Sequence, residues 1–135
     1  MLRLVLALLL LGGVSAGQSP FDGSWVNKMG ERLPEGLIFY SLTEETSRCS
    51  CAIGGIEIKP DGYDHKTPER AYWETLNVQA VDTHTVLLIA KKAGRTMFTE
   101  VDSVSQDGKT LTQVVKDTTE AETVTTETQS HRVEG

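Results

Sequence analysis

Residues 85–116 read TVLLIAKKAGRTMFTEVDSVSQDGKTLTQVVK, and this stretch decides the fold. Segments in which apolar and polar residues alternate are separated here by two groups of turn-forming residues. Asp107-Gly108 is typical of a hairpin with a type I′ turn, which needs positive φ at both central positions. Lys92-Ala93-Gly94 fits a three-residue loop in which Gly94 takes the left-handed conformation. The stretch therefore predicts consecutive antiparallel strands over residues 86–91, 95–105 and 109–116.

The same turns predict which residues oppose one another across the hairpins. A third loop over residues 82–84 extends the meander toward Trp73, so that it covers residues 73–133. The length of each loop determines which two residues face each other at the end of the hairpin, and the other opposed pairs follow from that one. The predicted opposed pairs are Val104 and Leu111, Asp102 and Gln113, Glu100 and Val115, Leu88 and Phe98, Val78 and Leu88, and Ala80 and Val86.

One face of the predicted sheet is mostly apolar and should form the core. Successive residues point to opposite faces, and opposed residues share a face. The core face then carries Leu76, Val78, Ala80, Val86, Leu88, Ala90, Phe98, Val104, Leu111 and Val115. Glu100, Asp102 and Gln113 fall on this face too, although burying such groups dry and unpaired costs several kcal/mol. We expect them at a wet barrel mouth, in a cavity that holds water or a polar ligand, or turned outward by a bulge.

The chain before the meander predicts shorter elements. Strands are expected over residues 21–26, 37–46 and 56–59, with Leu37, Phe39 and Leu42 competing for the interior. Gly and Pro residues predict loops over 27–36 and 63–70, while 48–55 is ambiguous. The many threonine and valine residues favour strands over helices. About eight short strands at this spacing predict an all-β barrel or sandwich.

The N-terminus has the pattern of a signal peptide over residues 1–16. Arg3 precedes a short apolar run over 4–11, and Val14 and Ala16 are the small residues of a cleavage site. The run is too short for a permanent transmembrane helix, which needs about 20 apolar residues. The alternative is a buried first helix. We expect cleavage after Ala16 and a single exported domain over 17–135, periplasmic or secreted, without stable membrane insertion.

The charge of the mature chain excludes some partners. The whole sequence has 13 basic and 19 acidic residues, and removing Arg3 leaves 12 basic residues and a formal charge of −7. Nucleic acids and anionic lipid surfaces both select basic patches, so neither is an expected partner. The oligomeric state is not predicted.

Cys49 and Cys51 are the only two cysteines of the sequence. An exported compartment favours their oxidation. Residues two apart on an extended strand lie near the upper limit of disulfide reach, so a local bridge between them needs a turn. The alternatives are free or intermolecularly paired thiols and a metal site. We expect no metal and no cofactor, because no histidines cluster with the cysteines.

Three motifs follow one another in the order of a known group of proteins. They are Gly23-Ser24-Trp25, then Asp82-Thr83-His84-Thr85-Val86 leading to Lys91-Lys92-Ala93-Gly94-Arg95, then Ser105-Gln106-Asp107-Gly108-Lys109-Thr110-Leu111-Thr112. In these motifs the chain resembles small exported bacterial proteins with a lipocalin-like (calycin-type) β-barrel and no established activity. The resemblance covers the chain from about Ile56 onward and is weak over 27–55. It implies an antiparallel up-and-down meander that closes into a small lipocalin-like barrel, and it implies no function.

Three classes of function are compatible with these features. The first is a carrier that binds a small, partly apolar molecule inside the barrel, without catalysis and with no catalytic residues. Its expected lining is Leu76, Leu88, Phe98, Glu100, Asp102, Leu111 and Gln113. The second is an interaction or structural module of the envelope with a filled barrel. The third is a small barrel isomerase or lyase, in which Glu100 and Asp102 would work as acid and base.

Overall fold

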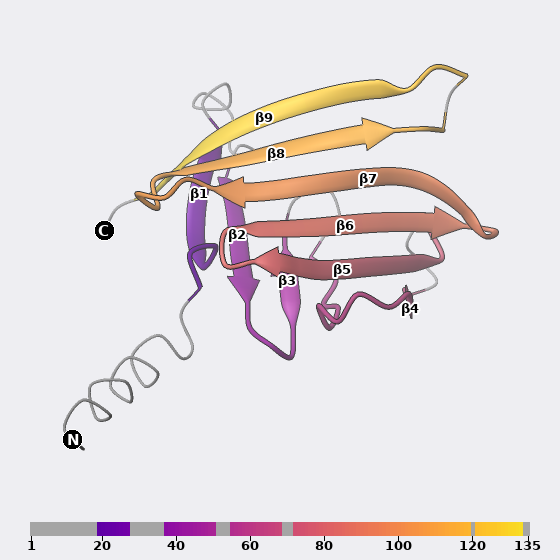
Figure 1. The fold of residues 1–135 in the computed structure, drawn as a ribbon, viewed down its shortest axis with the longest axis horizontal. Coiled ribbons are helices and arrows are strands. Elements are labelled where there is room, and N and C mark those ends of the chain that lie inside the picture. Colours follow the sequence, from indigo (N-terminus) through magenta and orange to yellow (C-terminus); the bar gives the residue numbers. More distant parts are fainter. Residues whose placement is uncertain (1–18, 28–36, 51–54, 69–71, 120, 134–135) are drawn as a thin grey trace, which may run out of the picture.

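A computed structural model describes residues 19–27, 37–50, 55–68, 72–119 and 121–133. These residues form one curled antiparallel sheet of nine strands (Figure 1). The expected signal peptide over 1–16 lies outside the described residues. The part of the chain that the structure describes contains no helix long and apolar enough to cross a membrane. The strands are β1 Gly23–Asn27, β2 Leu37–Leu42, β3 Ser47–Cys49, β4 His65–Lys66, β5 Thr75–Asp82, β6 Thr85–Lys92, β7 Arg95–Val104, β8 Thr110–Asp117 and β9 Val124–Arg132.

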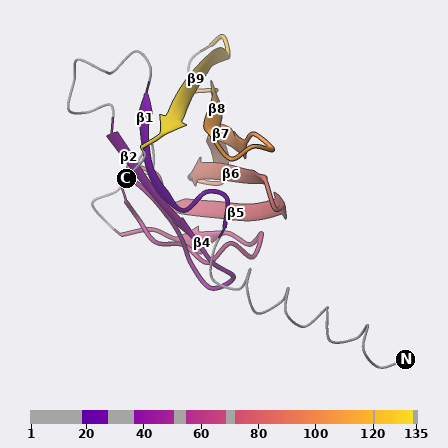
Figure 2. The ribbon, with the colours of Figure 1, turned by 90° about the vertical axis from the view of Figure 1, so that its left-hand side faces the viewer.

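The strand order is that of an up-and-down barrel with one open seam. It runs β3-β2-β1-β9-β8-β7-β6-β5-β4, so the first strand pairs with the last and the seam lies between β3 and β4. Isolated backbone bridges narrow the seam, since Ile58 pairs with Ser47 and Asp61 pairs with Gln79. The sheet is thus a half-barrel, and the all-β meander is confirmed. The curl is visible in Figure 2, where β1 and β2 run obliquely to β5 and β6.

Two short elements differ from the expected strands. Residues 56–59 were predicted as a strand, but Ile58 makes only a bridge to Ser47. A loop was predicted over 63–70, yet His65 and Lys66 form β4 by pairing with Leu76 and Thr75. Both differences lie at the seam. Whether these residues form a strand there depends on pairing with other strands, which local sequence does not show.

The hairpin between β7 and β8 has the predicted register but a different turn. Val104 opposes Leu111, Asp102 opposes Gln113 and Glu100 opposes Val115, as predicted. A type I′ turn is wrong, because φ is positive at Gly108 (75°) and not at Asp107. The Gly108 amide donates to the Ser105 carbonyl (2.9 Å), and the Asp107 carboxylate accepts from the Lys109 amide (3.0 Å). The loop therefore has four residues, 106–109, and not two. Because it adds one residue to each side of the predicted turn, the strands pair in the predicted register.

The hairpin between β6 and β7 is shifted from the prediction by two residues. Ala93 (φ 53°) and Gly94 (φ 76°) form a two-residue loop, and Lys92 opposes Arg95. The ladder is irregular between Ala90 and Lys91, so Leu88 opposes Glu100 instead of Phe98. The Glu74 carboxylate accepts from the Ala93 amide (2.8 Å), a contact with a residue outside the hairpin. Beyond the irregular step, from Ala90 and Phe98 onward, the shift is even, so these side chains stay on their predicted faces.

The third predicted loop is also shorter than expected. Asp82 opposes Thr85, which leaves a two-residue loop and an irregular ladder between Ala80 and Asp82. The predicted pairs in this hairpin, Val78 with Leu88 and Ala80 with Val86, are confirmed. The irregular step absorbs the missing loop residue.

The core agrees with the predicted inner face except at a few positions. Ala80 is exposed, and Phe98 and Val115 are half-buried. On β2 the predicted phase is wrong, because Leu37 and Phe39 are 42% and 56% exposed while Leu42 is buried as expected. The residues buried at the centre of the half-barrel are Phe21, Trp25, Ile38, Tyr40, Leu42, Cys49, Ile58, Leu76, Val78, Val86, Leu88, Ala90, Val104 and Leu111.

An arginine joins the two ends of the described chain beside the ladder between β1 and β9. The Arg132 guanidinium lies 4.3 Å from the centre of the Trp25 ring. It donates to the carbonyl groups of Gly108 (3.0 Å), Asp22 (2.6 Å) and Pro20. A side chain at residue 23 would place its Cβ 2.8 Å from Arg132 Nη1, so Gly23 (φ 126°) is required here. This contact supports the ladder between β1 and β9.

Candidate functional site

Four polar side chains meet inside the half-barrel, and we call them the carboxyl cluster: Tyr40, Glu100, Asp102 and Gln113. Glu100 and Asp102 come from alternate positions of β7, and Gln113 opposes Asp102 from β8. Tyr40 reaches them from β2, which is not a neighbour of β7 in the sheet. Glu100 is 1% exposed and Asp102 is 0% exposed. The predicted inward direction of Glu100, Asp102 and Gln113 is therefore confirmed, and neither a bulge nor solvent removes them from the interior.

Each acid of the cluster receives a hydrogen bond from a neutral donor. The Tyr40 hydroxyl donates to Asp102 Oδ2 at 2.6 Å. The Gln113 amide donates to Glu100 Oε2 at 3.1 Å. The first of these bonds crosses the interior and joins two parts of the sheet that share no ladder.

Burial keeps the two acids from ionising together. Desolvation, and then the hydrogen bond and charge of Asp102, raise the pKa of Glu100 to about 10 against a small opposing effect of Gln113. Desolvation also raises the pKa of Asp102, opposed by its hydrogen bonds with Glu100, Tyr40 and Gln113. Two adjacent buried carboxylates repel each other, so one is held protonated. At neutral pH Glu100 therefore holds a proton, which it donates to Asp102.

Several buried polar atoms have no other partner. Glu100 Oε1 and Asp102 Oδ1 receive no hydrogen bond from a donor in the described residues, which leaves only the acid proton between the two side chains. The hydroxyl of Ser130, which is 0% exposed, also lacks a partner there. Ser130 opposes Leu111 and shares its inward face. Unsatisfied buried acceptors are costly, so this face carries more polarity than packing requires.

The leucines of the predicted lining are fully buried by other side chains. Leu76 and Leu111 are 0% exposed and Leu88 is 1% exposed, so no water-sized space adjoins them. Of these residues Leu88 lies nearest in register to the cluster, because it opposes Glu100. Leu76 lies on β5, two strands from β7. Phe98 is half-buried and makes an edge-on contact with the Trp73 ring at 5.3 Å between centroids.

The inner face opens to solvent at one end, which we call the mouth. Its inward residues are Phe98, Val115, Asp117, Val124 and Thr126. Thr126 opposes Val115, which opposes Glu100, so the mouth begins one strand from the carboxyl cluster. Thr126 is exposed and Val124 is 52% exposed, while Phe98 and Val115 are half-buried. In Figure 1 these ends of β8 and β9 project to the right of β1, β2 and β3.

Sequence reasoning missed two residues of this region. Residues 37–40 are all aliphatic or aromatic, so alternation does not show which of them point inward. The prediction placed Leu37 and Phe39 inside, and Tyr40 therefore outside. Ser130 could have been found by extending the β8 register into β9, where it opposes Leu111.

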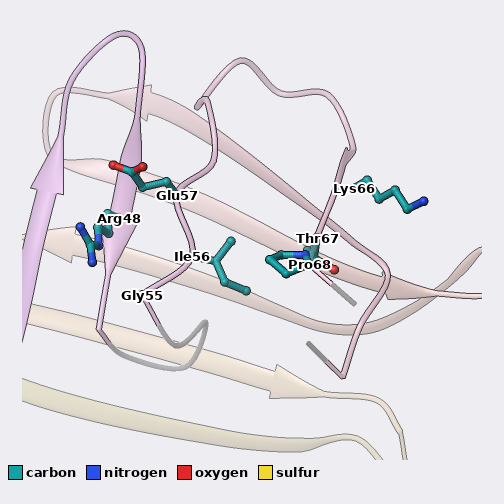
Figure 3. A pocket seen from close by; sticks show the side chains of 7 residues that line it. All are labelled: Arg48, Gly55, Ile56, Glu57, Lys66, Thr67 and Pro68. Carbon is teal, nitrogen blue, oxygen red and sulfur yellow. The ribbon is translucent and has the colours of Figure 1, made fainter. Parts of the chain in front are cut away.

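Two hollows lie away from the two acids, and Tyr40 is the one member of the carboxyl cluster that lines either of them. The larger, about 530 Å³, is at the seam and is lined by Arg48, Gly55, Ile56, Glu57, Lys66, Thr67 and Pro68. Figure 3 shows Lys66 pointing away from Arg48, so these two cations do not converge on a common ligand. The other, about 350 Å³, lies beside β2 and β3, and neither hollow is lined by Glu100, Asp102 or Gln113.

The cysteines and metal ligands give no second site. Cys49 is disulfide-bonded, and Cys51 lies outside the described residues. Among the residues that the structure describes, no group of three histidine, cysteine, aspartate or glutamate side chains is placed to hold a metal ion. A comparison of this chain with protein-family models, with curated proteins and with solved structures finds no match.

Proposed function

We propose that the protein is an exported, lipocalin-like barrel that binds a small, partly apolar molecule on the inner face of its sheet, without catalysis. The observation that supports this proposal is the carboxyl cluster. A domain of this size gains nothing in stability from two dry acids, since apolar side chains of similar volume are as good or better. Ligand sites, in contrast, combine an apolar concavity with a few polar groups that orient the ligand.

The mouth supports the same proposal, because it provides a way in. Phe98 is the inward residue of β7 next to Glu100, and it is only half-buried. Displacing its ring would connect the cluster with solvent. The ligand would place hydrogen-bond donors at Glu100 and Asp102, and its apolar part would take the position of the Phe98 ring. The lipocalin-like barrel and the exported location in this proposal come from the resemblance to exported lipocalin-like proteins.

A second function is favoured by the tight interior. Trp25, Leu76 and Leu111 are 0% exposed, as in a barrel filled by its own side chains. In that case the protein is an interaction or structural module of the envelope, and the cluster serves to tie β2 to β7. The two functions differ in whether the mouth opens.

Native mass spectrometry of protein purified from its own envelope distinguishes them. A carrier shows a population whose mass exceeds that of the mature chain by a small molecule. Phe98→Ala should lose that population, while Val101→Ala should keep it, because Val101 is 40% exposed on the outer face of the same strand. A mass equal to that of the bare chain in every preparation, together with no uptake of apolar probes, would favour the filled module.

A further inference from the structure

The carboxyl cluster contains two acids and no compensating cation. Its donors, Tyr40 and Gln113, are neutral. In the described part of the chain, neither acid takes part in an ion pair. A site of this kind has a negative potential once either acid ionises, because buried charge is poorly screened.

The unpartnered atoms of the two acids are acceptors, while the unpartnered indole N–H of Trp73, which lies beside Phe98, is a donor. Glu100 Oε1 and Asp102 Oδ1 have no donor other than the acid proton, and the fully buried Ser130 hydroxyl can accept as well. Ser130 points to the same interior, because it opposes Leu111, which opposes Val104 on β7. Glu100 Oε1 and Asp102 Oδ1 therefore favour a ligand group that brings N–H donors to the two acids.

The side chains around the acids do not supply another proton carrier. Val86 opposes Asp102, Leu88 opposes Glu100, and Thr128 opposes Gln113 from β9. None of these titrates. Among the described residues Tyr40 is the other titratable group in contact with the acids, and burial raises its pKa well above the usual value. Asp117 shares the inward face at the mouth, opposite Phe98, and hydrogen bonds with Thr119 lower the pKa of that carboxyl group. Proton exchange near neutral pH is thus confined to the two acids.

We propose that the inner site takes a small organic cation, an ammonium ion with an apolar body, which binds Glu100 and Asp102 in place of their shared proton. This inference rests on the proposed function and names the ligand class for the same site. The ammonium N–H groups donate to both carboxylates, and the apolar body lies against Phe98 and Val115. One cation enters and one proton leaves to solvent, so the net charge of the site is unchanged.

Three probes with the same six-carbon chain test the proposal: hexylamine, 1-hexanol and hexanoate. Each is titrated by calorimetry into the mature protein at neutral pH, in two buffers of different protonation enthalpy. Hexylamine should bind at least about tenfold more tightly than hexanol, and hexanoate should not bind. The buffer dependence of the heat should show about one proton released per amine. The affinity for the amine should rise by up to about tenfold per pH unit around neutrality, because aliphatic amines stay charged until about pH 10.

Glu100→Gln provides the matched variant. It should remove the proton release and weaken hexylamine at least about tenfold while leaving hexanol unchanged. Glu127→Gln, on the exposed face of β9, should change neither. If hexanol binds as tightly as hexylamine and no proton is released, the cation proposal is wrong while interior binding stands. If none of the three probes binds, the cation proposal also fails, and the native mass spectrum decides the carrier function independently. The number of protons that the wild-type protein releases per bound hexylamine decides the proposal even if the variant does not fold.

Discussion

Replacing Glu100 by glutamine should stabilise the protein at neutral pH and have little effect in acid. The amide keeps the shape of the protonated acid, so it can donate to Asp102 and accept from Gln113 as Glu100 does. What it removes is the cost of keeping a proton on a carboxyl group that would ionise in the unfolded chain.

The size of the effect follows from the pKa difference. The pKa of Glu100 is raised from 4.5 to about 10 in the folded protein. A group with a raised pKa contributes its full stability below the unfolded value of 4.5, and this stability is lost as the pH rises toward 10. The loss is about 1.4 kcal/mol per pH unit, or about 4 kcal/mol at a pH three units above the unfolded pKa. Glu100 is 1% exposed, so solvent screening does not reduce this figure.

Urea unfolding at several pH values between about 4.5 and 8 measures the prediction. The difference in free energy of unfolding between Glu100→Gln and wild type should grow from near zero by about 1.4 kcal/mol per pH unit. The exposed Glu127→Gln should show no such slope. A difference that is constant with pH, or a variant less stable than wild type at neutral pH, would refute the argument that Glu100 is held protonated by burial.

Three further predictions concern the cluster, the closure and export. Tyr40→Phe removes the hydroxyl that donates to buried Asp102 at 2.6 Å and should lower the free energy of unfolding by about 1–3 kcal/mol at neutral pH in urea titrations; an unchanged midpoint would contradict this bond across the interior. Gly23→Ala brings a Cβ within 2.8 Å of Arg132 Nη1, whereas Gly94→Ala meets open space. Both incur backbone strain of about 1–3 kcal/mol, so the first should melt at a clearly lower temperature than the second, and equal melting would argue against the Arg132 contact. N-terminal sequencing of the exported product should begin at Gly17; an intact Met1 would overturn the signal-peptide prediction and the redox argument for Cys49.

The sequence by itself determined the long hairpins and the faces of their strands. Turn residues and alternation act over a few neighbouring positions, so local chemistry was enough to oppose Asp102 to Gln113 and to direct Glu100 inward. The error in the β6–β7 register did not change the faces from Ala90 and Phe98 onward, because an extra residue in β7, Met97, and a shorter loop at Ala93-Gly94 together gave an even shift.

Only the tertiary structure decided which side chains of β2 point inward, the pairing of β1 with β9 and the state of the acids. Residues 37–40 are apolar at both phases, and the choice of Tyr40 as an inward residue depends on Asp102, 62 positions away. The pairing of β1 with β9 is supported by Arg132, which donates to the carbonyl groups of Pro20 and Asp22 from the other end of the chain. The proton on Glu100 likewise depends on how completely distant strands exclude water. Each of these contacts joins residues far apart in sequence, and its free energy exists only once the chain has folded.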